Sequence, residues 1–333
     1  MDTTYLIIEG SNFIGCHLIR AILDRDPEAT ILNLEANPNA SRLAGVAGAG
    51  YDRVHSFRGR TDDPAFVDHI MAEWRPAYIV NLACLSPAPG ACDPAVSTRR
   101  LLEAARLWPV QRLLLASSAS VYGESHRRYG ERQSPSPRTV AAAACVASEN
   151  YAIAYYNEYR IPAIVTRGCA VHGPYQDPVQ QPAHVITRLL QDQVAVVAGN
   201  GCEVDDWVSV FAYCQMLYFV LTRGVPGEIY NIARENPVDR KSFMMTLASI
   251  LGKPGTLIQF RSERRSASGG ALDTAKLAAL GWVQPVLSVY DSLCATVQWH
   301  IDHEEWWRPL TMTGLYRQYI DDLNRPAPVA AAT

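Results

Sequence analysis

Residues 5–15 read Tyr-Leu-Ile-Ile-Glu-Gly-Ser-Asn-Phe-Ile-Gly, a short apolar run followed by a turn that contains glycine. A helical pattern of apolar residues continues from Cys16 to Asp24, and a second apolar run occupies residues 30–34. A strand, a tight turn, a helix and a second strand in this order form a βαβ unit. The stretch therefore predicts that the chain opens as an α/β fold.

The same alternation continues through the first half of the chain. Further apolar runs of strand length follow at residues 54–57, 78–82, 112–116 and 163–166, and helical patterns separate them. This alternation is typical of a parallel sheet with helices on both faces. After Val171 the pattern is less regular, with short strands expected at residues 228–231 and 257–260 and helices at 242–251 and 286–303.

We therefore predict three parts. Residues 1–170 should form a Rossmann-like doubly wound parallel sheet. Residues 171–325 should form a smaller C-terminal α/β lobe, completed by C-terminal helices, and residues 326–333, rich in Pro and Ala, should form a flexible tail.

Composition excludes several classes of protein. The 333 residues are 48% hydrophobic and 19% charged, as expected for a globular protein, and the formal net charge is -3. A charge this small gives no field that attracts nucleic acid or a membrane surface, so neither is an expected partner. No apolar run approaches the roughly 20 residues that span a bilayer. Because Met1 and Asp2 lead straight into the first strand, we expect no leader segment and a cytoplasmic location.

The eight cysteines show neither a C-x-x-C pair nor a histidine at the spacing of a zinc site. We therefore expect reduced, mostly buried thiols and no metal ion.

A series of short motifs resembles a known family. In chain order it reads Phe-Ile-Gly at 13–15, Val-Asn-Leu-Ala at 80–83, Ser-Ser-Ala-Ser-Val-Tyr-Gly at 117–123, Val-Thr-Arg at 165–167, Asp-Trp-Val-Ser-Val at 206–210 and Gly-Glu-Ile-Tyr-Asn-Ile at 227–232. The series resembles the extended short-chain dehydrogenases/reductases, and most of all the dTDP-glucose 4,6-dehydratases. The resemblance implies the Rossmann-like fold. It also implies a homodimer formed by the helices near residues 95–107 and 140–159.

The resemblance implies an NAD site in the first turn, where the family pattern is G-x-x-G-x-x-G. In this chain those three positions are Glu9, Asn12 and Gly15. The pattern lets a pyrophosphate approach the backbone at a helix N-terminus, and a carboxylate at residue 9 would repel it. The residues of this cofactor site are Gly10, Asn12, Phe13, Ile14, Gly15 and Glu35, the last on the adenosine ribose. Because two of three glycines are replaced, we expect a degenerate site and no required cofactor, with NAD as the alternative.

The family's catalytic positions are also changed. Its Tyr-x-x-x-Lys pair, in which the lysine lowers the tyrosine pKa, falls on Ala141 and Cys145. Its Thr-Asp-Glu acid and base group reads Ser-Ala-Ser at 118–120, and an arginine that pairs with the nucleotide diphosphate is Asp205. We therefore expect the chemistry of the dehydratases to be lost.

Six side chains near the family's site positions are candidates for any remaining chemistry: Ser118, Ser120, Tyr122, Cys145, Glu149 and His172. Glu149 lies one helical turn after Cys145 and is a candidate general base, while the alternative is an ordinary surface or dimer-helix carboxylate. His172 is a candidate acid or base, or else a structural histidine, and Cys145 is a nucleophile only if a nearby cation stabilises its thiolate.

Three functions remain open. Alanine replaces larger groups at residues 141–144 and at residues 119 and 170, which suits a mostly apolar small molecule. Our main hypothesis is a redox-independent enzyme of the cyclase, isomerase or lyase type. The alternatives are a non-catalytic pseudoenzyme that binds a partner protein, and an NAD-dependent nucleotide-sugar dehydratase or epimerase.

Overall fold

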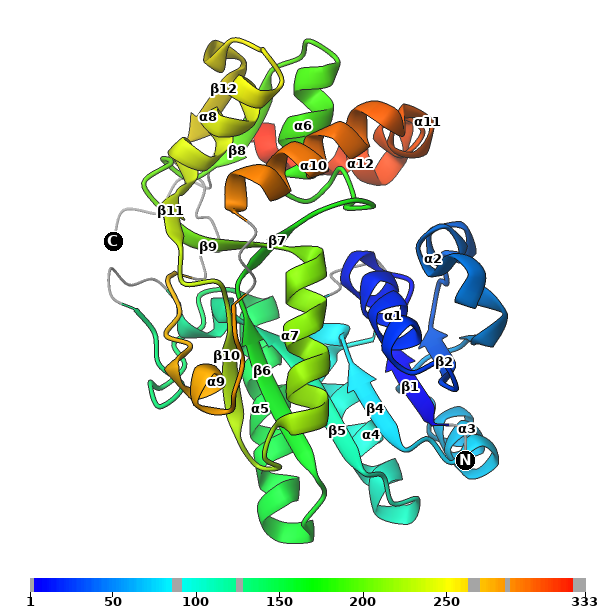
Figure 1. The fold of residues 1–333 in the computed structure, drawn as a ribbon. Coiled ribbons are helices and arrows are strands. Elements are labelled where there is room, and N and C mark those ends of the chain that lie inside the picture. The colour runs from blue at the N-terminus through cyan, green and yellow to red at the C-terminus, as the bar shows by residue number, and fades with distance from the viewer. Residues whose placement is uncertain (1–2, 86–91, 124–127, 263–269, 285–287, 326–333) are drawn as a thin grey trace.

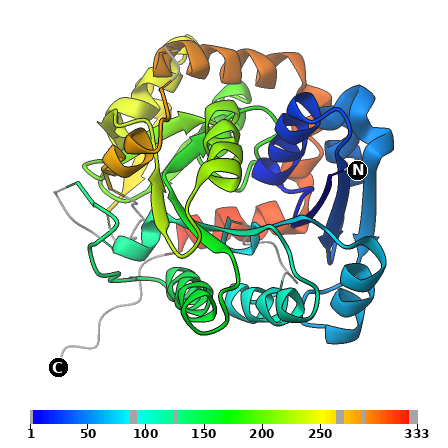
Figure 2. The same ribbon diagram turned by 60° about the horizontal axis from the view of Figure 1, so that its bottom comes forward.

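The computed structural model describes residues 3–85, 92–123, 128–262, 270–284 and 288–325 (Figures 1 and 2). Its central sheet has seven strands in the order β10-β6-β5-β4-β1-β2-β3, and every neighbouring pair is parallel. These strands are β1 (Thr4–Ile8), β2 (Thr30–Glu35), β3 (Val54–Arg58), β4 (Tyr78–Asn81), β5 (Arg112–Ser118), β6 (Ala163–Gly168) and β10 (Ile229–Ile232). The predicted Rossmann-like doubly wound parallel sheet is confirmed.

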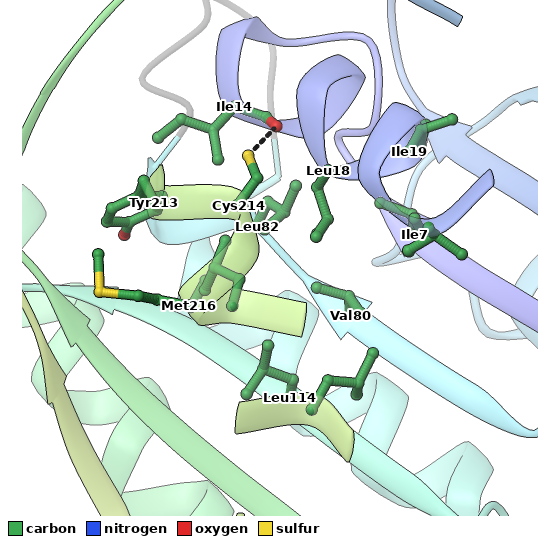
Figure 3. Packing of buried hydrophobic residues seen from close by; sticks show 14 of the residues in the cluster. Ile7, Ile14, Leu18, Ile19, Val80, Leu82, Leu114, Tyr213, Cys214 and Met216 are labelled. Atoms are coloured by element: carbon green, nitrogen blue, oxygen red, sulfur yellow. Dashed lines mark hydrogen bonds between the residues drawn. The ribbon is translucent and has the colours of Figure 1, made fainter. Parts of the chain in front are cut away.

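Helices cover both faces of this sheet. One face carries α1 (Phe13–Arg25), α2 (Ala40–Ala47) and α7 (Val210–Arg223), and the other carries α3 (Pro64–Trp74), α4 (Pro94–Leu107) and α5 (Val140–Tyr159). Side chains alternate along β1, so Ile7 joins the first core while Leu6 and Ile8 join the second. In the first core, the Cys214 thiol of α7 donates to the Ile14 carbonyl of α1 at 3.5 Å (Figure 3). This packing joins α7 to the first βαβ unit.

A smaller lobe lies beyond the carboxyl ends of the parallel strands (Figure 1). It holds the sheets β11-β9-β7 and β12-β8, with α6, α8 and α10 packed around a third core. Its elements are β7 (Ala170–His172), α6 (Ala183–Leu190), β8 (Ala195–Ala198), β9 (Val204–Ser209), β11 (Pro237–Asp239), α8 (Arg240–Ile250), β12 (Ile258–Arg261), α10 (Val289–Asp302), α11 (Glu304–Trp307) and α12 (Gly314–Asn324). Short 3-10 helices include η2 (Ala83–Leu85), η3 (Ala119–Tyr122) and η5 (Leu310–Met312).

The chain returns to the large sheet after entering the small lobe. Strand β10 pairs with β6, and α9 (Ala275–Ala279) packs beside β10. The large sheet therefore includes residues well beyond 170. The predicted division at residue 170 stays a prediction, and the predicted tail at 326–333 lies outside the described residues.

No helix in the described ranges is long and apolar enough to cross a membrane.

Helices α4 and α5 lie side by side on the outside of the sheet (Figure 2). They expose apolar side chains, including Leu107 (66%), Val140 (90%) and Tyr151 (37%). We predict that two copies pair through these helices, so light scattering on the eluted protein should give twice the 36.7 kDa of one chain. Tyr151→Glu should shift the mass towards one chain because it places charge in an apolar interface. A mass of 36.7 kDa for the unchanged protein at micromolar concentration would contradict the prediction.

Four buried histidines make the stability of the fold depend on pH. Burial lowers the pKa of His17 and His300 to about 4 and that of His172 and His184 to about 3. The unfolded chain therefore binds protons first, so their contribution is complete above about pH 6.5 and is lost as pH falls. At pH 5, each of these histidines should lower the free energy of unfolding by about 2 kcal/mol relative to neutral pH.

We predict a lower midpoint of urea unfolding at pH 5 than at pH 7. Asp206, whose pKa burial raises to about 6, and Glu35, whose pKa burial also raises, act in the opposite direction but are two groups against four. His300→Gln should reduce the difference between the two midpoints, whereas His69→Gln, at a largely exposed side chain, should leave it unchanged. Equal midpoints at the two pH values would refute the prediction.

Candidate functional site

A cavity of about 780 Å³ lies where the carboxyl ends of the parallel strands meet the small lobe. Its wall comes from the β1–α1 turn, the end of β2, η3, the β6–β7 segment, residues 176–181, β9, and the starts of α8 and α12. In open α/β sheets ligands bind at this edge. The cavity is therefore the candidate active site.

The β1–α1 turn keeps a glycine-like backbone despite its sequence. Glu9 has φ +62°, a left-handed conformation that glycine adopts most easily, and its N–H donates to the Leu34 carbonyl. A Cβ at Gly10 would lie 2.6 Å from Asn33 Oδ1, and a Cβ at Gly15 would lie 2.5 Å from the Glu9 carbonyl oxygen. Positions 10 and 15 therefore need glycine, while position 9 combines a left-handed backbone with a carboxylate side chain.

The N-terminus of α1 points at the cavity. Asn12 caps the helix, its Oδ1 accepting the N–H of Gly15 at 2.6 Å, and Asn12, Phe13 and Ile14 line the wall. The Asn12 Nδ2 group is buried and has no hydrogen-bond partner among the described residues. A helix N-terminus carries partial positive charge, so this turn offers backbone and side-chain donors to an anion.

Glu35 lies at the end of β2, beside the turn. It accepts the Ser11 N–H at 3.2 Å and an Asn33 side-chain N–H at 2.8 Å, and burial raises its pKa. Arg42 of α2, which sequence reasoning missed, donates to Asp177 at 2.6 Å and to the Ser11 carbonyl. It thereby ties α2 to the segment after β7, a contact between residues 135 positions apart that no local pattern could reveal.

The predicted catalytic residues divide into two groups. Ser118 and Ser120 line the cavity, and the Ser118 hydroxyl accepts the Ser120 N–H at 3.2 Å. Cys145 lies just behind the wall, and its thiol donates to the carbonyl of Cys84 at 3.8 Å. Cys84 itself lines the cavity, and its pKa is raised by the neighbouring Cys145 thiol and by burial. The Cys84 thiol is therefore protonated at neutral pH.

Tyr122, Glu149 and His172 lie outside the cavity wall. The Tyr122 hydroxyl donates to Asn231 at 2.8 Å. Glu149 forms an ion pair of 2.7 Å with Arg167, and both side chains are 3% exposed. This geometry favours a structural role for Glu149 over that of a general base, although its catalytic role and that of Tyr122 stay predictions.

His172 is enclosed by two hydroxyl groups. Its Nδ1 lies 2.9 Å from Thr296 Oγ1 and its Nε2 lies 3.2 Å from Ser292 Oγ. Burial keeps the ring neutral, since its pKa is lowered to about 3. The predicted acid or base role of His172 also stays a prediction, and the contacts favour a structural one.

A second ion pair lies at the small-lobe end of the cavity. Arg240 contacts Asp205 at 2.5 Å, and both side chains are 5% exposed and line the wall. The sequence placed Asp205 where the family has an arginine, but it did not show that α8 supplies a guanidinium opposite it. Among the residues that the structure describes, no group of His, Cys, Asp and Glu is placed to hold a metal ion.

Comparison with known proteins gives one consistent result. The model of the NAD dependent epimerase/dehydratase family matches residues 6–233. The dTDP-glucose 4,6-dehydratase of Neisseria meningitidis is 28% identical, covering 94% of this chain and 97% of its own length. The low-salt glycan biosynthesis protein Agl12 of Haloferax volcanii is 29% identical, covering 90% of this chain and 99% of its own length.

Solved structures of dTDP-glucose 4,6-dehydratases are also similar to this chain. The dTDP-glucose 4,6-dehydratase of Bacillus anthracis, in complex with NAD, has a TM-score of 0.84 at 25% identity and covers 92% of this chain and 99% of its own. The dTDP-glucose 4,6-dehydratase DesIV of Streptomyces venezuelae, with NAD and TYD bound, has a TM-score of 0.83 at 25% identity and covers 92% of this chain and 100% of its own.

These findings correct the prediction that no cofactor is required. The similar structures hold NAD and the matching family is NAD dependent, so the findings point to NAD as the cofactor. The prediction was wrong because it counted glycines, whereas Glu9 adopts the backbone conformation of a glycine. The findings also favour the NAD-dependent alternative over the redox-independent enzyme. This chain is a member of the NAD dependent epimerase/dehydratase family.

Proposed function

We propose that this protein is an NAD-dependent enzyme that acts on a nucleotide-linked sugar in the 780 Å³ cavity. The observation that carries the proposal is the β1–α1 turn. It combines a left-handed backbone at residue 9, a glycine required at residue 15, and a buried Asn12 amide without a partner among the described residues. These features fit a dinucleotide pyrophosphate at the start of α1.

The residues that would hold NAD lie along one side of the cavity. Gly10 and Gly15 let the turn fold closely against Asn33 and the start of α1, and the cavity-lining Asn12, Phe13 and Ile14 would border the pyrophosphate. Glu35 would accept hydrogen bonds from the adenosine ribose hydroxyls. When bound, NAD supplies an acceptor and donor of hydride for a carbinol carbon of the substrate.

The chain's own polar groups suggest how the sugar is held. Ser118 and Ser120 offer hydroxyl groups at the carboxyl end of β5. Ser-Ala-Ser at 118–120 contains no carboxyl group, so this segment cannot supply the acid and base that expel water. We therefore favour hydride exchange without elimination, as in epimerases, over dehydration. Because the family's tyrosine position is Ala141, the Ser118 hydroxyl would have to pass the proton of the reacting hydroxyl to solvent in the cavity and return it.

Arg240 is the group we propose for the substrate phosphates. Its Nε and Nη2 atoms donate to Asp205, and its Nη1 atom donates to the Ala198 carbonyl. A guanidinium has five N–H groups, so roughly two remain for phosphate oxygens. The proposal places the small-molecule substrate between Ser118 and Arg240, and it retains the cytoplasmic location expected from the sequence.

The charge on Glu9 should weaken NAD binding without preventing it. We predict that Glu9→Gly tightens NAD about tenfold, because it removes a carboxylate near the pyrophosphate and relieves a left-handed non-glycine residue. Gly15→Val should abolish binding, since its side chain would meet the turn. Calorimetric titration with NAD measures both effects, and Glu28→Gln, at an exposed residue, is the control. Failure of the unchanged protein to bind millimolar NAD would sink the proposal.

We expect Ser118 to affect the rate of substrate turnover and not the affinity for NAD. We predict that the NAD-loaded protein converts a nucleotide sugar, tested on dTDP-glucose and UDP-glucose with products separated by mass spectrometry. Ser118→Ala should lower kcat by about 10- to 100-fold because a hydrogen bond to the reacting hydroxyl is lost. Its NAD affinity should not change. Ser134→Ala, at an exposed serine, should behave as the unchanged protein. If neither sugar is consumed, the assigned substrate class is wrong.

A further inference from the structure

A second cavity, of about 400 Å³, lies between the end of α6 and helix α12. Arg188 and Gln191 border it from the α6 side, and Tyr316, Arg317 and Asp321 border it from α12. None of these residues belongs to the wall of the large cavity. The second cavity is therefore separate from the site assigned to NAD and the sugar.

Two arginines, Arg188 and the exposed Arg317, line this cavity together with Asp321. The Nε atom of Arg188 donates to the Val194 carbonyl at 2.9 Å, which orients the guanidinium, and the same guanidinium lies beside the Tyr316 hydroxyl. Within the described ranges, neither Arg188 nor Arg317 forms an ion pair, although Asp321 lines the same cavity. Arg188 is half-buried. A half-buried charge without a counter-ion is unfavourable, so an anion bound here would be stabilised.

The charge of Arg188 affects the pKa of a neighbouring side chain. His184 lies one helical turn before it, and burial together with the Arg188 charge lowers the His184 pKa to about 3. Tyr316 packs on His184 with ring centroids 6.2 Å apart and is 5% exposed. Burial raises the pKa of the Tyr316 hydroxyl, and the neighbouring Arg188 guanidinium, which lies within hydrogen-bonding reach, partly offsets that rise. The cavity therefore combines an arginine that has no ion-pair partner among the described residues with a buried tyrosine hydroxyl beside it.

The second cavity shares a wall with the first. Leu310, Thr313 and Leu315 line the large cavity, while Thr311 and Tyr316 line the small one. Helices η5 and α12 thus separate the two spaces, with α12 packed against β8 (Figure 1). A ligand that joins Arg188 to Arg317 would connect α6 to α12 across this wall.

We propose that the second cavity binds the oxyanion group of a small metabolite, a phosphate or a carboxylate, between Arg188 and Arg317. Occupancy holds α12 against α6 and so stiffens one wall of the large cavity. Arginine suits this role because its planar fork matches the geometry of both anions. The inference stands on this cavity alone and does not depend on the reaction assigned to the large one.

The binding test uses the full chain without NAD. Inorganic phosphate is titrated and followed by ³¹P line broadening, and succinate is titrated by calorimetry. We expect saturable binding of at least one of them, with at least tenfold loss of affinity in Arg188→Gln and in Arg317→Gln. Arg308→Gln is the matched control, because Arg308 is an exposed arginine paired with Glu304 outside the cavity. Tighter binding of phosphate or of succinate identifies the anchoring group, and either result supports the proposal.

A second measurement keeps the test valid if a variant folds poorly. Hydrogen exchange of the unchanged protein is compared with and without the anion, and exchange at residues 314–324 should become slower. The proposal is overturned if neither anion binds saturably, or if Arg188→Gln and Arg317→Gln bind as the unchanged protein does. The latter result would place the anion elsewhere, for example at Arg240 in the large cavity.

Discussion

The contact between Gly15 and the backbone of residues 9 and 10 sets where α1 begins, and much of the molecule depends on that position. Because residue 15 has no side chain, the first turn of α1 sits directly on the β1 turn. Helix α1 then packs against α7, which in turn packs on β5, β6 and β10. The same contact directs the N-terminus of α1 into the large cavity. One close approach of backbone to backbone thus supports both the core and the cofactor site.

Charge inside the large cavity is arranged in pairs. Arg42 with Asp177 and Arg240 with Asp205 each join a helix to a distant segment, and each pair is largely buried. Buried pairs of this kind are costly to break because the remaining charge is left without a partner. The two ion pairs therefore hold the segments at two ends of the cavity in place. The carboxylates of Glu9 and Glu35 add negative charge between them, which any anionic ligand must tolerate.

The sequence was informative where structure is local. Apolar periodicity located the first βαβ unit and most strands of the large sheet, because a strand or helix leaves its period in consecutive residues. Strand β10 was expected as a short strand, but its place beside β6 depends on a return of the chain that no spacing encodes. Arg240 and Arg42 were missed for the same reason: their partners are 35 and 135 residues away. The cofactor was misjudged because a count of glycines does not reveal that Glu9 adopts a left-handed backbone, the conformation that glycine favours.

The placement of β10 has a consequence for synthesis on the ribosome. Chains emerge N-terminus first, so β6 waits as an open sheet edge until residues 229–232 appear. Helix α7, which covers one apolar face of the same sheet, also arrives late, at residues 210–223. The nascent sheet therefore exposes a free strand edge and an apolar face while the residues between β6 and β10 are being synthesised. A truncated chain ending near residue 170 would leave the β6 edge and the face that α7 covers exposed. Such a chain should be bound by chaperones or aggregate and not form a stable domain.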